Sequence, residues 1–125
     1  MIIRYFVYAQ QKDESIEIVE DTLKIIDGDI VLKEYLVIEP YWKIDGMYTV
    51  ELGIKFNDKT KQIKSFLDNL SDYWITFGEP VDEILTSQKG QNCYIKDNRI
   101  EMINIFFELS SDSRYNDTGL QIGKL

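Results

Sequence analysis

Two long runs of strand-forming residues, 30–44 and 47–56, are separated only by the pair Asp45-Gly46. In the second run apolar and polar side chains alternate, which is the period of a strand with one buried face. An Asp-Gly pair between two such runs is the strongest short-range signal of a β-hairpin, because a tight turn needs residues that tolerate positive φ. The sequence therefore predicts a hairpin over residues 30–56, with Pro40 at an edge, a bulge or a bend.

One helix is expected before this hairpin in the chain and one after it. Residues 14–26 place their apolar side chains on one half of a helical wheel and their charged side chains on the other half. That pattern favours a helix that ends at Gly28, whereas a second hairpin across Asp27-Gly28 is the competing interpretation. Residues 59–74 carry a clearer apolar stripe and predict the second helix.

Three further segments complete the expected sheet. Residues 2–9 and 99–109 are rich in β-branched and aromatic residues, and the second segment is apolar on both faces, as in a central strand. Residues 75–86 predict one bent strand or two short strands around Pro80. The expected fold class is therefore α+β: an antiparallel sheet with two helices on one face, in the split β-α-β (ferredoxin-like) order, with extra C-terminal β. If residues 14–26 were strands, the fold would be a β-rich sheet with one helix.

The chain of 125 residues has the size of one domain. We expect a single α+β domain over residues 1–109, followed by a polar C-terminal segment, 110–125, that docks as a short edge strand or frays. The start of the chain lacks the basic region and cleavage site of a signal peptide, and no run approaches the ~18 apolar residues of a membrane span. The single cysteine, Cys93, agrees with a reducing compartment, so a cytoplasmic location is expected.

The chain contains no histidine, which removes the commonest proton shuttle and metal ligand near neutral pH. A lone cysteine cannot form a zinc site within one chain, and the scattered glycines form no phosphate-binding motif. Carboxylates gather on expected helix and turn surfaces, such as Glu17 with Glu20 and Asp82 with Glu83, where solvated polar side chains are the expected arrangement and a buried catalytic pair is not. We therefore expect no enzyme activity, no metal ion and no cofactor.

Acidic residues outnumber basic residues by 22 to 14, which gives a formal net charge of −8. Because phosphate groups are bound by clustered Lys and Arg, this charge disfavours nucleic acid and anionic membranes as ligands. Solubility alone accounts for such a charge. The more specific interpretation is a basic protein partner, whose association would be steered electrostatically.

Aromatic side chains gather at the end of the predicted hairpin. Tyr41 and Trp42 follow Pro40, and Tyr48 lies across the hairpin. Rigid aromatic side chains within a charged rim have the composition of a protein interface, whereas Trp42 folding back over the core is the competing interpretation. The candidate partner-binding residues are Glu34, Glu39, Tyr41, Trp42, Asp45, Tyr48 and Glu51.

In its general character the chain resembles the small acidic immunity proteins of bacterial polymorphic and contact-dependent toxin systems. The resemblance lies in size, in acidity and in aromatic and acidic residues available for contact. It implies a non-enzymatic cytoplasmic protein that neutralises a cognate, basic, nuclease-like toxin by tight one-to-one binding. The alternative is a small-ligand-binding regulatory module of ferredoxin-like fold, and either protein would be a monomer or a homodimer.

Overall fold

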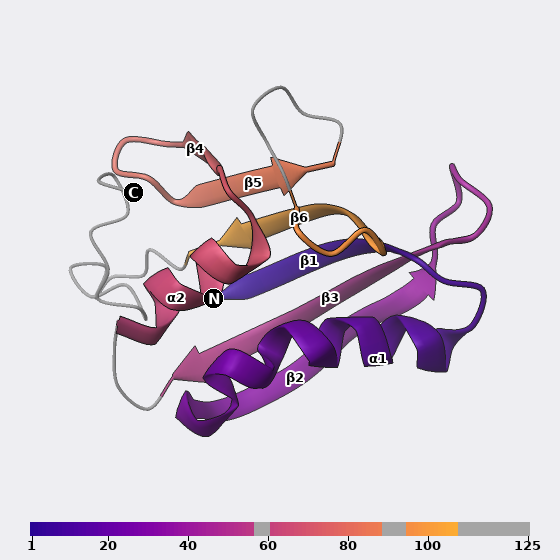
Figure 1. Cartoon of the computed structure of the whole chain (residues 1–125), viewed down its shortest axis with the longest axis horizontal. Coiled ribbons are helices and arrows are strands. Elements are labelled where there is room, and N and C mark those ends of the chain that lie inside the picture. Colours follow the sequence, from indigo (N-terminus) through magenta and orange to yellow (C-terminus); the bar gives the residue numbers. More distant parts are fainter. Residues whose placement is uncertain (57–60, 89–94, 108–125) are drawn as a thin grey trace.

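A six-stranded antiparallel sheet forms the framework of the protein in the computed structural model, which describes residues 1–56, 61–88 and 95–107. The strand order is β2-β3-β1-β6-β5-β4, and two helices accompany the sheet (Figure 1). The elements in chain order are β1 (Ile2–Tyr8), α1 (Lys12–Leu23), a 3-10 helix (Lys24–Asp29), β2 (Ile30–Pro40), β3 (Met47–Phe56), α2 (Lys61–Leu70), β4 (Ile75–Phe77), β5 (Glu83–Ser87) and β6 (Ile100–Phe106). The predicted α+β class is confirmed.

The predicted hairpin is confirmed as β2 and β3, which pair along one edge of the sheet. The first strand ends at Pro40 rather than at residue 44, so the connection spans residues 41–46. This loop is held by hydrogen bonds from the Tyr41 N–H to the Met47 carbonyl (2.8 Å) and from the Ile44 N–H to the Tyr41 carbonyl (3.3 Å). Gly46 supplies the left-handed backbone (φ 78°) at the end of the loop, not at the centre of a two-residue turn.

Residues 14–26 are helical, as favoured over a hairpin, but the helix starts and ends differently from the prediction. It begins at Lys12, where the Glu14 carboxylate accepts a hydrogen bond from the Gln10 N–H (2.8 Å). After Leu23 the chain tightens into the 3-10 helix and continues through Gly28 to Asp29. Gly28 therefore does not terminate the helix.

The second predicted helix is shorter than residues 59–74 because its last turn is replaced by contacts with other segments. Helix α2 ends at Leu70, and Ser71 forms an antiparallel bridge with Ile95. The Trp74 indole N–H then donates to the Leu67 carbonyl (3.1 Å), which folds Trp74 back onto the helix end. The predicted start of this helix, at residues 59 and 60, lies outside the described residues.

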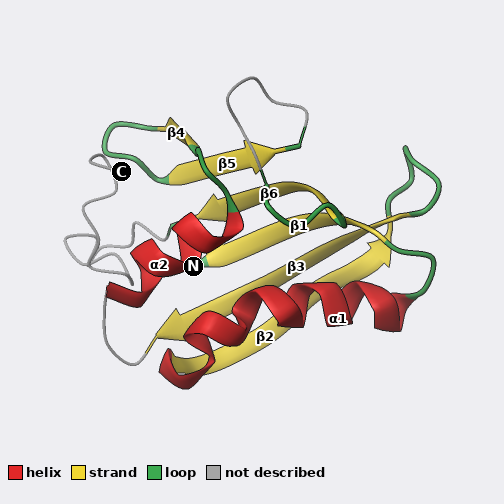
Figure 2. Ribbon diagram, in the orientation of Figure 1, coloured by secondary structure: helices red, strands yellow, loops and turns green. Residues whose placement is uncertain are grey.

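Both helices lie on the same face of the sheet, where they close a single hydrophobic core (Figure 2). Alternate residues of β1 and of most of β3 point toward them and are buried, whereas in β6 the consecutive residues Ile103, Asn104 and Ile105 are all buried. The buried residues contributed by the central strands and the two helices include Ile3, Tyr5, Val7, Val50, Leu52, Ile54, Ile103, Ile105, Ile18, Val19, Leu23, Ile63, Phe66 and Leu67. No described helix is long and apolar enough to cross a membrane.

The rest of the sheet consists of two short strands and one central strand. Residues 75–86 form two strands, β4 and β5, rather than one bent strand. Within the predicted strand 99–109, β6 covers Ile100–Phe106 and lies between β1 and β5, as expected of a central strand, and residues 108 and 109 lie outside the described residues. The additional strands of the described chain therefore fall between α2 and β6. The C-terminal strand expected within residues 110–125 lies outside the described residues.

Candidate functional site

The loop between β2 and β3 presents a tryptophan to solvent. Trp42 is 83% exposed, which rules out the alternative that it folds back over the core. The Lys43 ammonium lies 5.0 Å from the centre of the Trp42 ring, and the Tyr41 ring lies 6.3 Å from it. A large aromatic side chain exposed to this degree has the character of the residues that anchor protein interfaces.

Tyr41 anchors this loop to the sheet. Its ring meets the Phe6 ring edge-on, with centroids 5.1 Å apart and planes at 69°, the geometry that aromatic pairs prefer. Phe6 lies on the face of β1 opposite the buried residue Tyr5, so Tyr41 rests on the sheet face that faces away from the helices. Tyr48, in contrast, is half-buried and packs against the hydrophobic core, apart from Trp42.

The four candidate carboxylates occupy three different settings. Glu39 and Asp45 are exposed at the two ends of the loop and form no ion pair within the part of the chain that the structure describes. Glu51 accepts a hydrogen bond from Arg4 Nε at 2.9 Å, so its charge is neutralised locally. Glu34 lies at the other end of β2, opposite Gly53. The structure therefore brings Glu39, Trp42 and Asp45 together and separates Glu34 and Glu51 from them.

A hollow of about 270 Å³ lies over Gly53 on the face that the helices leave open. Leu32 and Leu36 of β2 are 55% and 46% exposed at its side. A Cβ atom placed on Gly53 would meet nothing within 4 Å. The sequence carried one signal for this hollow that was missed: a glycine inside an alternating strand marks a place where another group approaches the backbone.

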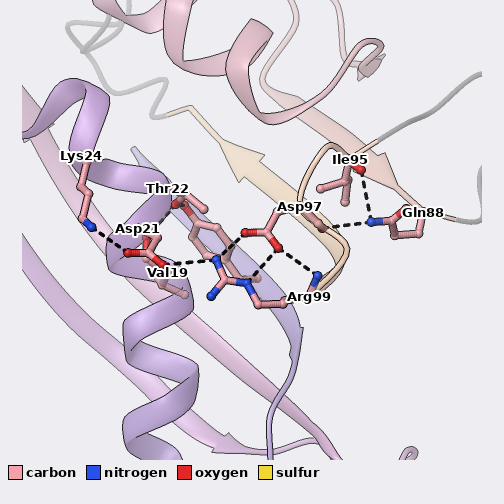
Figure 3. Close-up of polar contacts among 9 residues, drawn as sticks. Val19, Asp21, Thr22, Lys24, Gln88, Ile95, Asp97 and Arg99 are labelled. Carbon is pink, nitrogen blue, oxygen red and sulfur yellow. Dashed lines mark hydrogen bonds and ion pairs between the residues drawn. The ribbon is translucent and has the colours of Figure 1, made fainter.

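A second, polar hollow of about 490 Å³ lies between α1, α2 and the turn before β6. Its carboxylates are already engaged, because Arg99 Nη2 lies 3.2 Å from Asp21 Oδ2 and 2.7 Å from Asp97 Oδ2 (Figure 3). Lys24 Nζ also lies 2.9 Å from Asp21 Oδ1. The Arg99 hydrogen bond holds the pKa of Asp97 below its usual range. The cluster ties α1 to the turn that leads into β6.

Beside this cluster, the hydroxyl group of Tyr5 is sealed in the core. Tyr5 Oη lies 2.6 Å from Thr22 Oγ1, which in turn donates to the Val19 carbonyl at 2.7 Å. Burial raises the pKa of Tyr5 well above its ordinary value of 10. Near neutral pH this side chain stays protonated and does not serve as a general base.

A third polar group joins α1 to β2 and was not anticipated from the sequence. The Lys33 ammonium lies 2.7 Å from Glu20 Oε1, and the Tyr35 hydroxyl also donates to the Glu20 carboxylate. Although burial alone would raise the pKa of Glu20, the hydrogen bonds from Lys33 and Tyr35 lower it overall. Lys33 and Tyr35 are thereby fixed against α1, whereas Glu34 and Leu36, on either side of Tyr35, stay exposed.

The described residues contain no cluster that could hold a metal ion, because no three Asp, Glu, Cys or His side chains among them lie close enough to share one. Cys93 lies outside the described part of the chain. Comparison with known proteins finds no matching family model, no matching curated protein and no matching solved structure. Function is therefore inferred from the residues of this chain and their geometry.

Proposed function

We propose that this chain is a non-enzymatic binding protein that neutralises a cognate basic toxin in the cytoplasm by tight one-to-one binding. The observation that supports the proposal is the exposure of Trp42 at the tip of the β2–β3 loop. Tryptophan is highly buried on average in folded proteins, and tryptophans covered by a partner dominate the free energy of many interfaces. Trp42 is therefore the side chain that the partner covers.

The charge around this tip supports a basic partner. Glu39 and Asp45 flank the tip, and Lys43 is the only basic side chain among residues 39–47. Such a rim raises the association rate with a basic surface, and this gain falls as salt screens the charges. Binding that survives moderate salt would then rest on the packing of Trp42, with Tyr41 as its support.

We also infer that the fold is a split β-α-β arrangement with an inserted hairpin. The order β2-β3-β1-β6 places β3 between β1 and β2, and it places β1 between β3 and β6. Helix α1 connects β1 to β2, and α2 lies between β3 and β6 in the chain. Strands β4 and β5 extend this unit beyond β6 without altering its centre.

The test is a pull-down from lysate of the native host, with the chain as bait at low and at moderate salt. We expect one stoichiometric basic protein, whose toxic activity the chain inhibits when both are purified. Trp42→Ala should abolish capture at moderate salt, and Glu39→Lys with Asp45→Lys should slow association. Tyr73→Ala is the matched control, because Tyr73 is an exposed aromatic residue outside this loop. Equal capture by the Trp42→Ala and wild-type chains would contradict the proposal.

The second candidate function is a small-ligand-binding regulatory module, and the polar hollow beside Asn69 and Asn98 is the observation that favours it. Because Asp21 and Asp97 are already paired with Arg99, and Lys96 Nζ lies 3.5 Å from Asp72 Oδ1, any ligand there would use the asparagine side chains. A thermal-shift screen of metabolites tests it: stabilisation lost in Asn69→Ala would support the ligand module, and no stabilisation by any metabolite would count against it.

A further inference from the structure

The end of the β2–β3 hairpin remote from Trp42 carries a second exposed apolar surface. Glu34 and Pro40 are six residues apart on β2, which corresponds to roughly 20 Å at ~3.3 Å per residue. The hollow over Gly53 therefore lies well away from the loop assigned above to the toxin. A contact at this end leaves Trp42 uncovered.

Apolar side chains surround this hollow on the open face of the sheet. Ile2 of β1 and Glu34 of β2 are the register partners of Gly53 on its two sides. Leu32 and Leu36 project beside it from the edge strand, and Leu36 stands where the β2–β3 register shifts. An edge strand with exposed leucines is a place where proteins associate unless charges prevent it.

The rim of the hollow carries one exposed charge of each sign. Glu34 is the register partner of Gly53, and Lys55 is the register partner of Leu32. Neither side chain forms an ion pair with another residue in the described ranges, and both border the hollow. Lys55 would repel a uniformly basic partner, and Glu34 would repel a uniformly acidic partner.

A second copy of the chain satisfies both charges at once. In a two-fold contact residue i of one copy meets residue j of the other, and j meets i in return. We propose that the chain forms a homodimer through this surface, in which Glu34 of each copy pairs with Lys55 of the other. The exposed leucine Leu36 of each copy then enters the hollow over Gly53 of its partner.

The decisive experiment is sedimentation of two single charge reversals, measured separately and after mixing. The wild-type chain should sediment as a dimer, at twice its 14.7 kDa mass. Glu34→Lys and Lys55→Glu should each be monomeric, with the dimer dissociation constant raised at least about tenfold, because each reversal creates two repulsive contacts. Mixing the two variants should restore a dimer, since positions 34 and 55 of each copy then meet the opposite charge on the other copy.

If the dimer forms again on mixing, the charges must act between two copies, because each variant chain still carries its own substitution. An effect of the substitution within one chain would not be reversed by adding the other variant. Glu17→Lys and Lys12→Glu carry the same charge changes on helix α1 and should remain dimeric. Gly53→Val adds bulk at the hollow, where a Cβ meets nothing within 4 Å, so it should keep the fold and lose the dimer. Capture of the toxin should survive all of these changes, which keeps failure of this inference distinct from failure of the proposed function.

Three results would overturn the homodimer. The first is a wild-type chain that sediments as a monomer at every concentration. The second is a pair of single reversals that stay dimeric, and the third is a mixture of the two that stays monomeric. Circular dichroism of each variant checks that loss of the dimer is not loss of folding.

Discussion

Arg4 Nε donates to Glu51 Oε2 at 2.9 Å across strands β1 and β3, on the sheet face that the helices leave open. The same guanidinium group stacks 5.2 Å from the centre of the Phe106 ring on β6. One arginine on β1 thus contacts both neighbouring strands and neutralises the charge of Glu51 on β3. Polar and aromatic contacts within the chain therefore cover the middle of the open face, whereas Trp42 and the leucines of β2 are exposed away from it.

The pairing of Glu51 with Arg4 predicts that Glu51→Gln changes the free energy of unfolding little and leaves capture of the proposed partner unchanged. Both side chains are partly exposed, and such pairs contribute roughly 0–1 kcal/mol to the free energy of unfolding. Urea unfolding and the pull-down described above measure the two effects. Loss of capture in Glu51→Gln, with the fold intact, would place the interface over the middle of the sheet instead.

Alkaline pH should destabilise the protein through its buried tyrosine. Burial raises the pKa of Tyr5, whereas the unfolded chain releases that proton near pH ~10. Stability contributed by a raised pKa is present below the unfolded value and is lost as the pH rises above it. The free energy of unfolding should therefore fall by about 1.4 kcal/mol for each pH unit above ~10.

Urea titrations of wild type and Tyr5→Phe above and below pH ~10 check this slope. The variant should be less stable at neutral pH by about 1 kcal/mol, because the hydrogen bond to Thr22 is lost. Its alkaline slope should nevertheless be shallower than that of wild type. Tyr35, whose pKa is also raised by burial and by the Glu20 carboxylate, contributes a smaller part because it is more exposed. Parallel slopes in the two proteins would show that Tyr5 is not the group that titrates.

Acid pH should weaken the link between α1 and the turn before β6. The hydrogen bond from Arg99 lowers the pKa of Asp97, and the hydrogen bonds from Lys24 and Arg99 lower the pKa of Asp21. A lowered pKa contributes stability above the unfolded value of ~3.9, and that stability is lost as the pH falls through the folded value. The melting temperature should therefore drop below pH ~4 more steeply in wild type than in Arg99→Gln.

The matched control for this acid effect is Lys64→Gln, which removes an exposed pair with Asp68 at 3.2 Å. This control should follow the wild-type curve, because exposed helix pairs contribute little. A wild-type slope in Arg99→Gln as well would mean that other carboxylates govern the acid transition.

Two glycines should respond in opposite ways to alanine. Gly78 has φ 96°, and a Cβ there would lie 2.4 Å from Asp82 Oδ1, so Gly78→Ala should destabilise by at least about 1–2 kcal/mol. Gly28 lies in the 3-10 helix with nothing within 4 Å of the added atom, so Gly28→Ala should stabilise by about 0.4–1 kcal/mol. Thermal unfolding of both variants checks the difference, and equal effects would contradict these two backbone geometries.

The sequence predicted those parts of the fold that depend on local pattern. The alternation in residues 47–56 and the helical wheel of residues 14–26 each identified an element correctly, because burial of one face imposes that period. Element ends were predicted less well, since they are fixed by partners distant in the chain. Helix α2 stops where Ser71 meets Ile95, and no local pattern announces that bridge.

The candidate site was likewise predicted only in part from the sequence. Aromatic composition directed attention to Trp42, but the sequence left open whether its side chain is exposed, because that depends on the loop formed after β2 ends at Pro40. Glu51 looked equivalent to Glu39 in the sequence until its pairing with Arg4 was known. The hollow over Gly53 needed the cross-strand register, which brings Ile2 and Glu34 to its sides.

Strand β1 lies at the centre of the sheet although it is the first element of the chain, and Ile2 of β1 pairs in register with Phe106 of β6. During synthesis this strand therefore leaves the ribosome with both edges unpaired: one can pair once β3 has been made, and the other only after Ile100–Phe106 has been made. Long-range pairing of this kind slows folding and leaves a nascent chain open to wrong association. We expect the sheet to close only after translation has passed β6, so chains released before that strand should be substrates for chaperones and proteases rather than partly active proteins.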